Sequence, residues 1–228
     1  QSGLNGVTLA IEQFNRDGGL DGHMVELVVR DDAQNRETAA QSAKSLVDAR
    51  VDAVIGPFTS GMAEVIVPIT GKAGIFQVSP TITSMAFYGK DDNLFRINRT
   101  TRDNARDYAK VMVERGQKRI AVAYDVRNRN FTESWLREFQ EAVASRGAAV
   151  VAPVPYESSS DADFAKVVRG MLDKQPDSLF FISGALDVAR LAQQARRQAP
   201  KLPIGASEWA STEQLIHPGA ALLQGLLI

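Results

Sequence analysis

Hydrophobic and polar positions along the chain switch repeatedly between two periods, and this switching predicts alternating helices and strands. Leu4, Val7, Ile11 and Phe14 recur at helical spacing. Residues 51–56 instead form an apolar run that ends in Gly-Pro, which is typical of a strand buried on both faces. The predicted helices are 3–16, 36–50, 61–72 with an interruption at Pro68, 102–115, 131–146, 162–174 and 186–197. The predicted strands are 24–29, 51–56, 75–78, 95–97, 119–124, 149–154, 178–182, 204–206 and 222–228.

This order of elements predicts an α/β fold. Strict alternation of strands and helices indicates parallel sheets with right-handed crossovers. An irregular stretch near residues 95–101 is the best boundary, so we expect two doubly wound lobes, 1–98 and 99–228, joined by a hinge. A doubly wound lobe normally begins with a strand, whereas this chain begins inside a predicted helix and stops on an apolar strand. We therefore expect it to be a fragment of a longer protein.

Composition narrows the classes of function. The 228 residues carry 26 Lys and Arg against 27 Asp and Glu, with no block of like charge, which argues against a nucleic-acid partner. The absence of cysteine excludes disulfides, thiolate metal sites and cysteine nucleophiles. His23 and His217 lie far apart beside turn-forming residues, so we expect exposed loop positions and no metal site. Asp31 and Asp32 are interpreted as turn carboxylates, with a metal role as the alternative.

Two polar loops stand out, at residues 58–61 and 79–83. Each follows a predicted parallel strand, so both would emerge at the sheet edge where open α/β sheets bind ligands. The helix that starts near Gly61 offers free N–H groups, and Thr59, Ser60, Thr81 and Thr83 add hydroxyl donors. Such a cluster suits a carboxylate that is held without a formal cation. The alternative for Thr59 or Ser60 is an ordinary helix N-cap.

A second set of candidates lies in the predicted second lobe. Glu208 follows the strand 204–206 and could pair with a ligand ammonium group, or it could be a capping or solvated glutamate. Trp209 beside it could form an apolar wall or pack under a loop. Phe131 opens a helix after an irregular loop, where it could face a cleft or pack in the core.

Motifs for catalysis or for cofactor binding are missing. The sequence has no GxGxxG after a strand, no GxxxxGK[ST], no HExxH and no GxSxG. Ser60-Gly61 sits at a strand-to-helix turn, but the preceding Gly-x is absent and no histidine is placed to activate the serine. We therefore expect a binding protein without a cofactor rather than an enzyme.

The order of these segments resembles a known family. The segments NGVTLAIEQFNRDGGLDGHMVELVVRDDAQNRETAAQSAKSLVD, VDAVIGPFTSG and GIFQVSPTIT follow one another as in the type I periplasmic binding proteins. The resemblance covers the whole chain. More narrowly, the chain is similar to the leucine/isoleucine/valine-binding branch, whose members are the solute receptors of ABC importers.

The resemblance implies roles for particular residues. Ser60 and Thr83 would hold the ligand α-carboxylate, and Glu208 would meet the α-ammonium. Phe131 would cover the ligand in place of the family's usual tyrosine. Gly184 stands where the family has a second tyrosine, which removes a wall and a hydroxyl from the site. The remaining implied contacts come from the two first-lobe loops, namely Phe58, Thr59, Thr81 and Ile82, with the main chain of Phe58 and Thr81 lining the pocket.

The resemblance also implies a setting. It predicts a periplasmic or extracellular monomer, lipid-anchored in a Gram-positive source, that binds a small amino acid with an apolar side chain between its lobes and delivers it to a membrane permease. By the same comparison the chain lacks the first strand and roughly the last third. Two alternatives remain open: a sensing domain of a receptor or regulator with the same fold, and a binding protein for aromatic or aliphatic carboxylates or amides.

Overall fold

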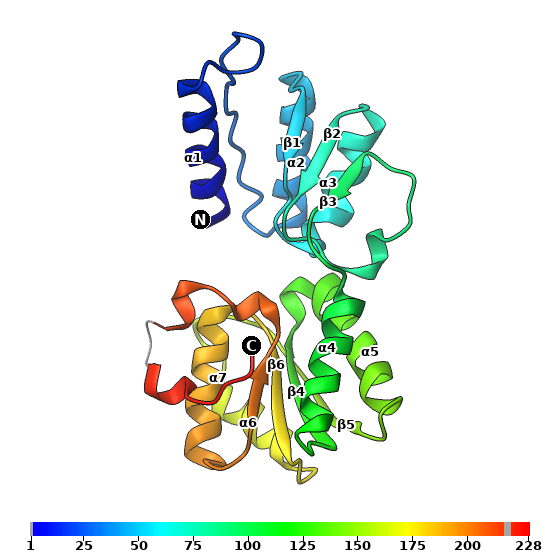
Figure 1. Cartoon of the computed structure of the whole chain (residues 1–228), viewed down its shortest axis with the longest axis vertical. Coiled ribbons are helices and arrows are strands. Elements are labelled where there is room, and N and C mark those ends of the chain that lie inside the picture. The colour runs from blue at the N-terminus through cyan, green and yellow to red at the C-terminus, as the bar shows by residue number, and fades with distance from the viewer. Residues whose placement is uncertain (1, 217–219) are drawn as a thin grey trace. The chain divides into compact units, whose positions relative to one another are not determined.

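The chain forms two compact units in the computed structural model, which describes residues 2–216 and 220–228. Unit 1 comprises Gln1–Thr83 and Gly89–Asn98, and unit 2 comprises Ser84–Tyr88 and Arg99–Ile228. The short segment Ser84–Tyr88 therefore belongs to unit 2, although it directly follows the second polar loop of unit 1. The backbone of each unit can be followed in Figure 1.

Unit 1 contains a small parallel sheet. In the described part of the chain its strand order is β1-β2-β3, and both pairings are parallel, with Ile55 opposite Val78 and Val78 opposite Phe95. The predicted interruption at Pro68 is wrong, because α3 runs through that residue. The elements are α1 (Ser2–Arg16), α2 (Arg36–Asp48), β1 (Ala53–Ile55), α3 (Ser60–Lys72), β2 (Phe76–Ser79) and β3 (Leu94–Arg96).

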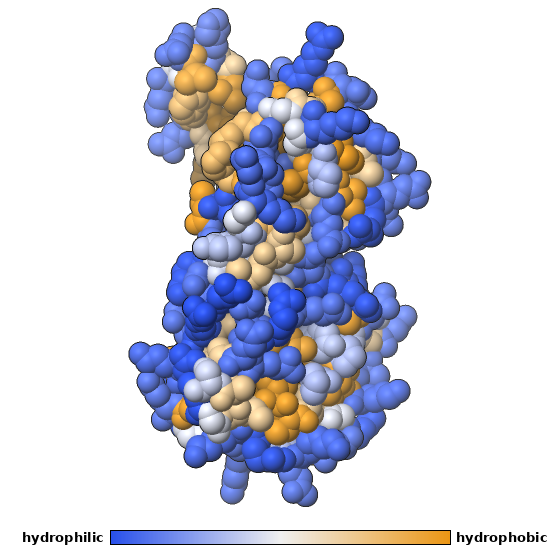
Figure 2. All heavy atoms as spheres, turned by 90° about the vertical axis from the view of Figure 1, so that its right-hand side faces the viewer, coloured by the Kyte–Doolittle hydropathy of each residue, from blue (hydrophilic) through white to orange (hydrophobic). Residues whose placement is uncertain are grey.

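The two faces of this sheet differ in burial. Val54 and Gln77 are buried on one face, and the Gln77 side chain accepts a hydrogen bond from Thr70 of α3 on that side. On the other face Ile55 is 50% exposed, and the rings of Phe76 and Phe95 pack together 5.1 Å apart while remaining about half exposed. The prediction that β1 is buried on both faces is therefore wrong for this chain. Hydrophobic residues are visible on the surface of unit 1 in the upper part of Figure 2.

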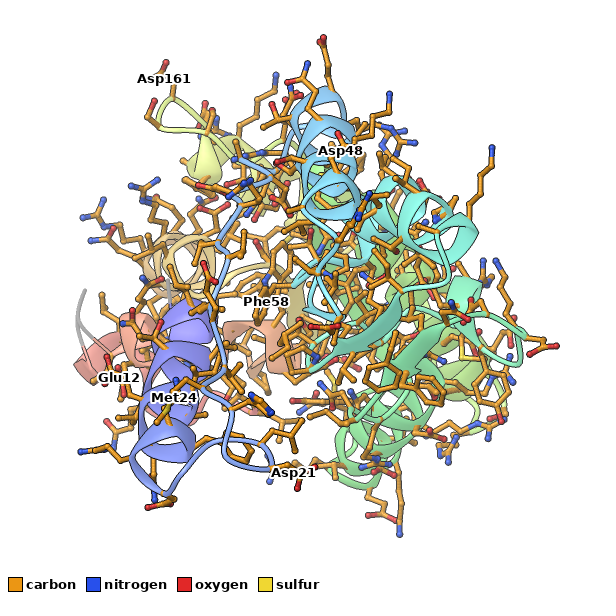
Figure 3. The ribbon with its side chains drawn as sticks, turned by 90° about the horizontal axis from the view of Figure 1, so that it is seen from above. Glu12, Asp21, Met24, Asp48, Phe58 and Asp161 are labelled. Carbon is orange, nitrogen blue, oxygen red and sulfur yellow. The ribbon has the colours of Figure 1, made fainter. Side chains whose placement is uncertain are left out.

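The segment after α1 does not form the predicted strand at residues 24–29. A strand is defined by its ladder of hydrogen bonds to a neighbour, and no neighbouring strand pairs with this segment among the described residues. Instead, both polar atoms of the Asn15 side chain bind the backbone of Val25, at 2.8 and 2.7 Å. Met24, labelled in Figure 3, is 68% exposed. The apolar pattern of this segment thus lacks the pairing that would make it a strand.

Unit 2 contains a larger parallel sheet with strand order β5-β4-β6-β7 in the part of the chain that is described. β4 pairs with β5 on one side and with β6 on the other, so the chain reverses its direction of progress across the sheet beside β4. Ligands of open α/β sheets bind outside the carboxyl ends of strands at such a reversal. The elements are α4 (Thr101–Glu114), β4 (Arg119–Asp125), α5 (Arg129–Ala144), β5 (Ala149–Tyr156), α6 (Phe164–Leu172), β6 (Ser178–Ile182), α7 (Ala185–Gln198) and β7 (Ile204–Ala206).

Both faces of the unit 2 sheet are covered by helices. Ile120, Val122 and Phe180 face a core that includes residues of α4 and α5, whereas Ala121 and Leu179 face a core shared with α6 and α7. Alternate residues of β4 and β6 therefore point into different cores, which is why these strands are continuous apolar runs. This arrangement confirms the predicted doubly wound α/β fold with parallel sheets.

The predicted strand at residues 222–228 is also wrong. Ala220–Leu223 forms a 3₁₀ turn, and Leu227 makes only an isolated bridge to Gly205 of β7. The apolar side chains Leu223 and Leu226 instead pack against the α6–α7 core. Among the described residues, no helix has both the length and the apolar composition needed to cross a membrane. His23 is exposed as predicted, and His217 lies outside the described residues.

Candidate functional site

The two polar loops of unit 1 emerge at the same edge of its sheet. Because β1 and β2 are parallel neighbours, the loop after Ile55 and the loop after Ser79 both leave from carboxyl ends. The first loop leads into α3, whose helix begins at Ser60. The N–H groups of its first turn have no partner within the helix, and they carry the positive end of its dipole. This edge therefore favours a negatively charged group.

Three side chains from β2 and its loop hold the first loop in place. Gln77 and Ser79 alternate along β2 and therefore point to the same side of the sheet, and Thr81 follows two residues later in the loop. Each donates a hydrogen bond to one of three consecutive carbonyl oxygens of residues 56–58. The distances are 2.9 Å from Gln77 Nε2 to the Gly56 oxygen, 2.7 Å from Ser79 Oγ to the Pro57 oxygen and 2.7 Å from Thr81 Oγ1 to the Phe58 oxygen.

Ser60 and Thr83 provide two buried hydroxyl groups that have no hydrogen-bond partner in the described chain. Each side chain is 2% exposed. A buried polar group without a partner costs free energy, and native proteins keep few of them. Thr59 occupies the N-cap position of α3, as one alternative predicted, but makes no side-chain cap bond, and the Ser60 hydroxyl has no partner among the described residues. The two orphan hydroxyls are therefore candidates to bind a ligand.

The other predicted residues of these loops have different placements. The Thr81 hydroxyl donates to the Phe58 carbonyl, so the hydroxyl-donor role predicted for it is wrong and only its main chain stays a candidate. Ile82 is fully buried and its N–H donates to Ser79 Oγ at 3.2 Å, so Ile82 anchors the loop. Phe58, labelled in Figure 3, is 37% exposed, and its ring lies against Gly3 of α1, where an added Cβ would come within 2.4 Å.

In unit 2, Glu208 is fixed by two long-range hydrogen bonds. Asn104 of α4 donates to its Oε1 at 2.9 Å, and the indole N–H of Trp135 of α5 donates to its Oε2 at 3.0 Å. Glu208 opens the 3₁₀ turn Glu208–Ala210 directly after β7 and is only partly buried. It is thus neither a cap nor a freely solvated glutamate. The neighbouring Ser207 hydroxyl is fully buried and, like those of unit 1, lacks a partner in the described chain.

Burial is the largest influence on the pKa of Glu208. Burial raises the pKa of Glu208, while the hydrogen bonds from Asn104 and Trp135 and the charge of Arg99 oppose that rise. Burial together with the charge of Glu208 raises the pKa of Tyr108 to about 12. The carboxylate is therefore less stable than an exposed one, and a cation placed beside it would stabilise its charged form.

Phe131 and Gly184 both lie beside the ring of Trp209. Phe131 is 5% exposed, and its ring meets the Trp209 ring edge to face at a centroid distance of 5.4 Å. A Cβ built on Gly184 would lie 3.8 Å from two atoms of the same indole. The Trp209 ring, which belongs to the residue after Glu208, therefore lies beside the position where the resemblance implies a missing tyrosine.

A further polar group occupies the carboxyl ends of β5 and β6. The Tyr156 hydroxyl contacts Ser183 and donates to the Asp187 carboxylate, and all three residues are buried. Burial raises the pKa of Tyr156, which keeps its hydroxyl protonated. Because these polar atoms satisfy one another, the group stabilises the sheet edge and leaves no orphan donor for a ligand. In the part of the chain that is described, no cluster of three or more His, Asp or Glu side chains could hold a metal ion.

Sequence reasoning missed the residues that position the site. Asn104 and Trp135 are separated from Glu208 by 104 and 73 residues, so no local pattern connects them. Gln77 and Ser79 had a usable signal, because polar residues at alternate positions of an otherwise apolar strand must bind something on its buried face. They support the loop rather than the ligand.

Comparison with known proteins is consistent over the whole chain. The profile of a family described as "Periplasmic binding protein" matches residues 1–228. The Leu/Ile/Val-binding protein of Citrobacter freundii is 25% identical over 229 aligned residues, covering 99% of this chain and 61% of the relative. The chain thus spans about three fifths of the length of this curated relative.

Solved structures show the same fold. A leucine-binding protein from Thermotoga maritima superposes with a TM-score of 0.84 at 24% identity, covering 93% of this chain and 61% of that one. A solute-binding protein of an ABC transporter from Rhodopseudomonas palustris, solved with 4-hydroxybenzoate, superposes with a TM-score of 0.78 at 20% identity, covering 89% and 56%. These likenesses establish the architecture of the two units.

Proposed function

This chain belongs to the periplasmic binding protein family, and from that premise we propose that it is the solute receptor of an ABC importer for an amino acid with an apolar side chain. In this proposal the protein is periplasmic or extracellular, carries out no chemical reaction and passes its ligand to a membrane permease. Its curated relatives are Leu/Ile/Val-binding proteins, and a structural relative from Streptococcus pneumoniae was solved with isoleucine.

The observation that carries the proposal is the pair of orphan hydroxyls, Ser60 and Thr83. A carboxylate accepts several hydrogen bonds, and bonds to a charged acceptor contribute more than neutral ones. Such a ligand would satisfy both hydroxyls as well as N–H groups at the start of α3. This supports a carboxylate as the group that unit 1 binds.

Glu208 supports an ammonium as the second recognised group. Its carboxylate is oriented by the neutral donors Asn104 and Trp135, which supply no positive charge to neutralise it. We propose that one amino acid satisfies both half-sites, with its carboxylate on unit 1 and its ammonium on Glu208. Closure on the ligand would follow, because only a closed state lets both halves contact it.

A screen of ligand-induced thermal stabilisation tests this function. Ligand binding to the native state raises the melting temperature by mass action. We expect stabilisation by L-leucine, L-isoleucine or L-valine and none by the corresponding amines or by neutral amides. If no amino acid stabilises the protein, the proposed function is wrong.

Variants then test each half-site by calorimetry. Ser60→Ala and Thr83→Ala should each weaken amino-acid binding by about 1–3 kcal/mol, or about 5- to 150-fold, and should not lower the stability of the ligand-free protein, because neither hydroxyl has a partner to lose. Glu208→Gln should weaken the binding of amino acids and leave the binding of simple carboxylates unchanged. Ser160→Ala is the matched control, since its exposed hydroxyl contacts only Asp161.

A second candidate ligand class is an aromatic or aliphatic carboxylate without an ammonium group. It is favoured by the raised pKa of Glu208, because a protonated Glu208 would donate a hydrogen bond to a ligand oxygen. The two classes differ in the sign of their pH dependence. Binding of an amino acid should strengthen as the pH rises through the pKa of Glu208, and binding of a carboxylate that accepts from protonated Glu208 should weaken.

A further inference from the structure

We propose that Trp209 determines which ligand side chain the receptor accepts, with Gly184 shaping the position of its ring. This inference rests on the proposed function, because it concerns the side chain of a ligand whose ammonium group binds Glu208. In this proposal the Trp209 ring favours the binding of amino acids with bulky apolar side chains over the binding of amino acids with small ones.

The backbone of Trp209 is held on both sides. The N–H of Ser207 donates to the Phe181 carbonyl of β6 at 2.9 Å, which ties the turn to the sheet. The N–H groups of Ala210 and Ser211 then donate to the carbonyls of Ser207 and Glu208, each at 3.0 Å. Trp209 therefore leaves a rigid turn, next in the chain to a carboxylate whose own position is fixed by two donors.

Gly184 is not required by the backbone conformation at its position, and a Cβ there would fit beside the Trp209 ring at an ordinary contact distance. Its φ of −71° and ψ of 160° are open to any residue, so the usual reason for a glycine does not apply. A Cβ at this position would already be in van der Waals contact with Cε2 and Cζ2 of Trp209, at 3.8 Å. A side chain larger than alanine would therefore displace the indole. Gly184 thus leaves open the space beside the Trp209 ring that a larger side chain would enter.

Phe131 holds the ring from a second direction. The two rings meet at an interplanar angle of 81°, the edge-to-face arrangement that aromatic pairs prefer. Phe131 is 5% exposed and Trp209 is partly exposed, so the indole presents the larger free apolar surface of the pair. Because Trp209 directly follows Glu208 in the same turn, we infer that a ligand bound to that carboxylate through its α-ammonium places its side chain near the indole.

Calorimetric titration of L-alanine, L-leucine and L-phenylalanine tests the role of Trp209. Removing contacts to a few methylene groups changes the discrimination between ligands by tenfold or more. We expect Trp209→Ala to reduce the ratio of leucine to alanine affinity at least tenfold, with the alanine affinity changed by less than about threefold. Trp209→Phe should give an intermediate ratio. An equal loss for alanine and leucine, or no change in either, would show that Trp209 is only structural.

Gly184→Val provides a second test that keeps Trp209 in place. The added side chain should displace the indole and lower the affinity for leucine and phenylalanine more than the affinity for alanine. Gly184→Ala, which adds only a contact at ordinary distance, is the matched control and should leave the ratio within about threefold. If Gly184→Val leaves the three affinities in their original ratio, the inference is wrong even where Trp209→Ala fails to fold.

Tryptophan fluorescence reports the contact directly. The sequence contains two tryptophans, and Trp135 is fully buried and bound to Glu208, whereas Trp209 is partly exposed. Leucine should change the emission of the wild-type protein, and Trp209→Phe should lose most of that change while still binding leucine by calorimetry. If the wild type binds none of the three amino acids, the proposed function and this inference both fail. If it binds them with ratios that no variant alters, only this inference fails.

Discussion

Replacement of Ser79 by alanine should destabilise unit 1 more than the removal of a single oxygen atom suggests. The Ser79 hydroxyl donates to the Pro57 carbonyl at 2.7 Å and accepts from the Ile82 N–H at 3.2 Å. Ser79 and Ile82 are both fully buried, so water cannot replace the lost bonds without disturbing the packing. A single hydroxyl therefore joins the two loops of the candidate site.

The magnitude follows from these two bonds. A buried carbonyl left without its short hydrogen bond costs about 1–3 kcal/mol, and loss of the longer bond to the amide adds about 0.5–1 kcal/mol. We expect Ser79→Ala to lower the free energy of unfolding by about 2–4 kcal/mol. At a urea m-value of about 2 kcal/mol per molar, the unfolding midpoint should fall by about 1–2 M.

Urea unfolding followed by far-UV circular dichroism measures this loss, with Ser160→Ala as an exposed serine control that should change stability by less than about 0.5 kcal/mol. Thr81→Val is a graded comparison, because its hydroxyl also binds a loop carbonyl at 2.7 Å but the residue is exposed. Its loss should fall between those of the two serine variants. A midpoint for Ser79→Ala equal to that of Ser160→Ala would refute the argument that β2 side chains hold the loop.

Three further outcomes follow from the contacts described. Asn104→Leu removes one donor from the Glu208 carboxylate, so it should raise the Glu208 pKa further, as carbon-detected NMR titration of the carboxyl carbon would show; an unchanged or lower pKa would contradict the assigned contact. Because burial already raises that pKa in the folded state, the native protein binds protons more readily there than the unfolded chain does. The contribution of Glu208 to stability is therefore fully present below the ordinary carboxyl pKa and is lost as the pH rises through the raised value. Between pH 4 and 7 the urea midpoint of the wild-type protein should therefore fall by an amount that is absent in Glu208→Gln. Gly19→Ala should cost more stability than Gly18→Ala, because both have positive φ but only the Cβ at Gly19 would meet a backbone carbonyl oxygen, at 2.0 Å; equal thermal melting temperatures for the two variants would contradict this.

Local patterns in the sequence were sufficient for most helices and for the strands of unit 2. The apolar runs at Ser178–Ile182 and Ile204–Ala206 have the predicted bounds, because strands buried between two helical layers must be apolar throughout. Residues 24–29 and 222–228 have the same local signal and form no strand. A strand needs a partner as well as a pattern, and the partner cannot be read from the segment itself.

The sequence alone suggested candidate ligand-binding residues, but it did not suggest the residues that hold them in position. Ser60, Thr83 and Glu208 lie within a few residues of the ends of β1, β2 and β7, so strand-end reasoning selects them as candidates. The donors that orient Glu208 come from two helices far away in the sequence, and their contact depends on how α4 and α5 pack. The proximity of the Trp209 ring to Gly184 also depends on the path of a turn, which composition and spacing do not reveal.

The way in which the first loop of unit 1 is held bears on how the candidate site can vary in sequence. Its carbonyls are held by Gln77, Ser79 and Thr81, which lie outside the loop. Substitutions at Thr59 or Ser60 therefore alter what the loop offers to a ligand without removing what holds the loop in position. The residues that are candidates to bind a ligand and the residues that hold the loop therefore occupy different positions in the sequence.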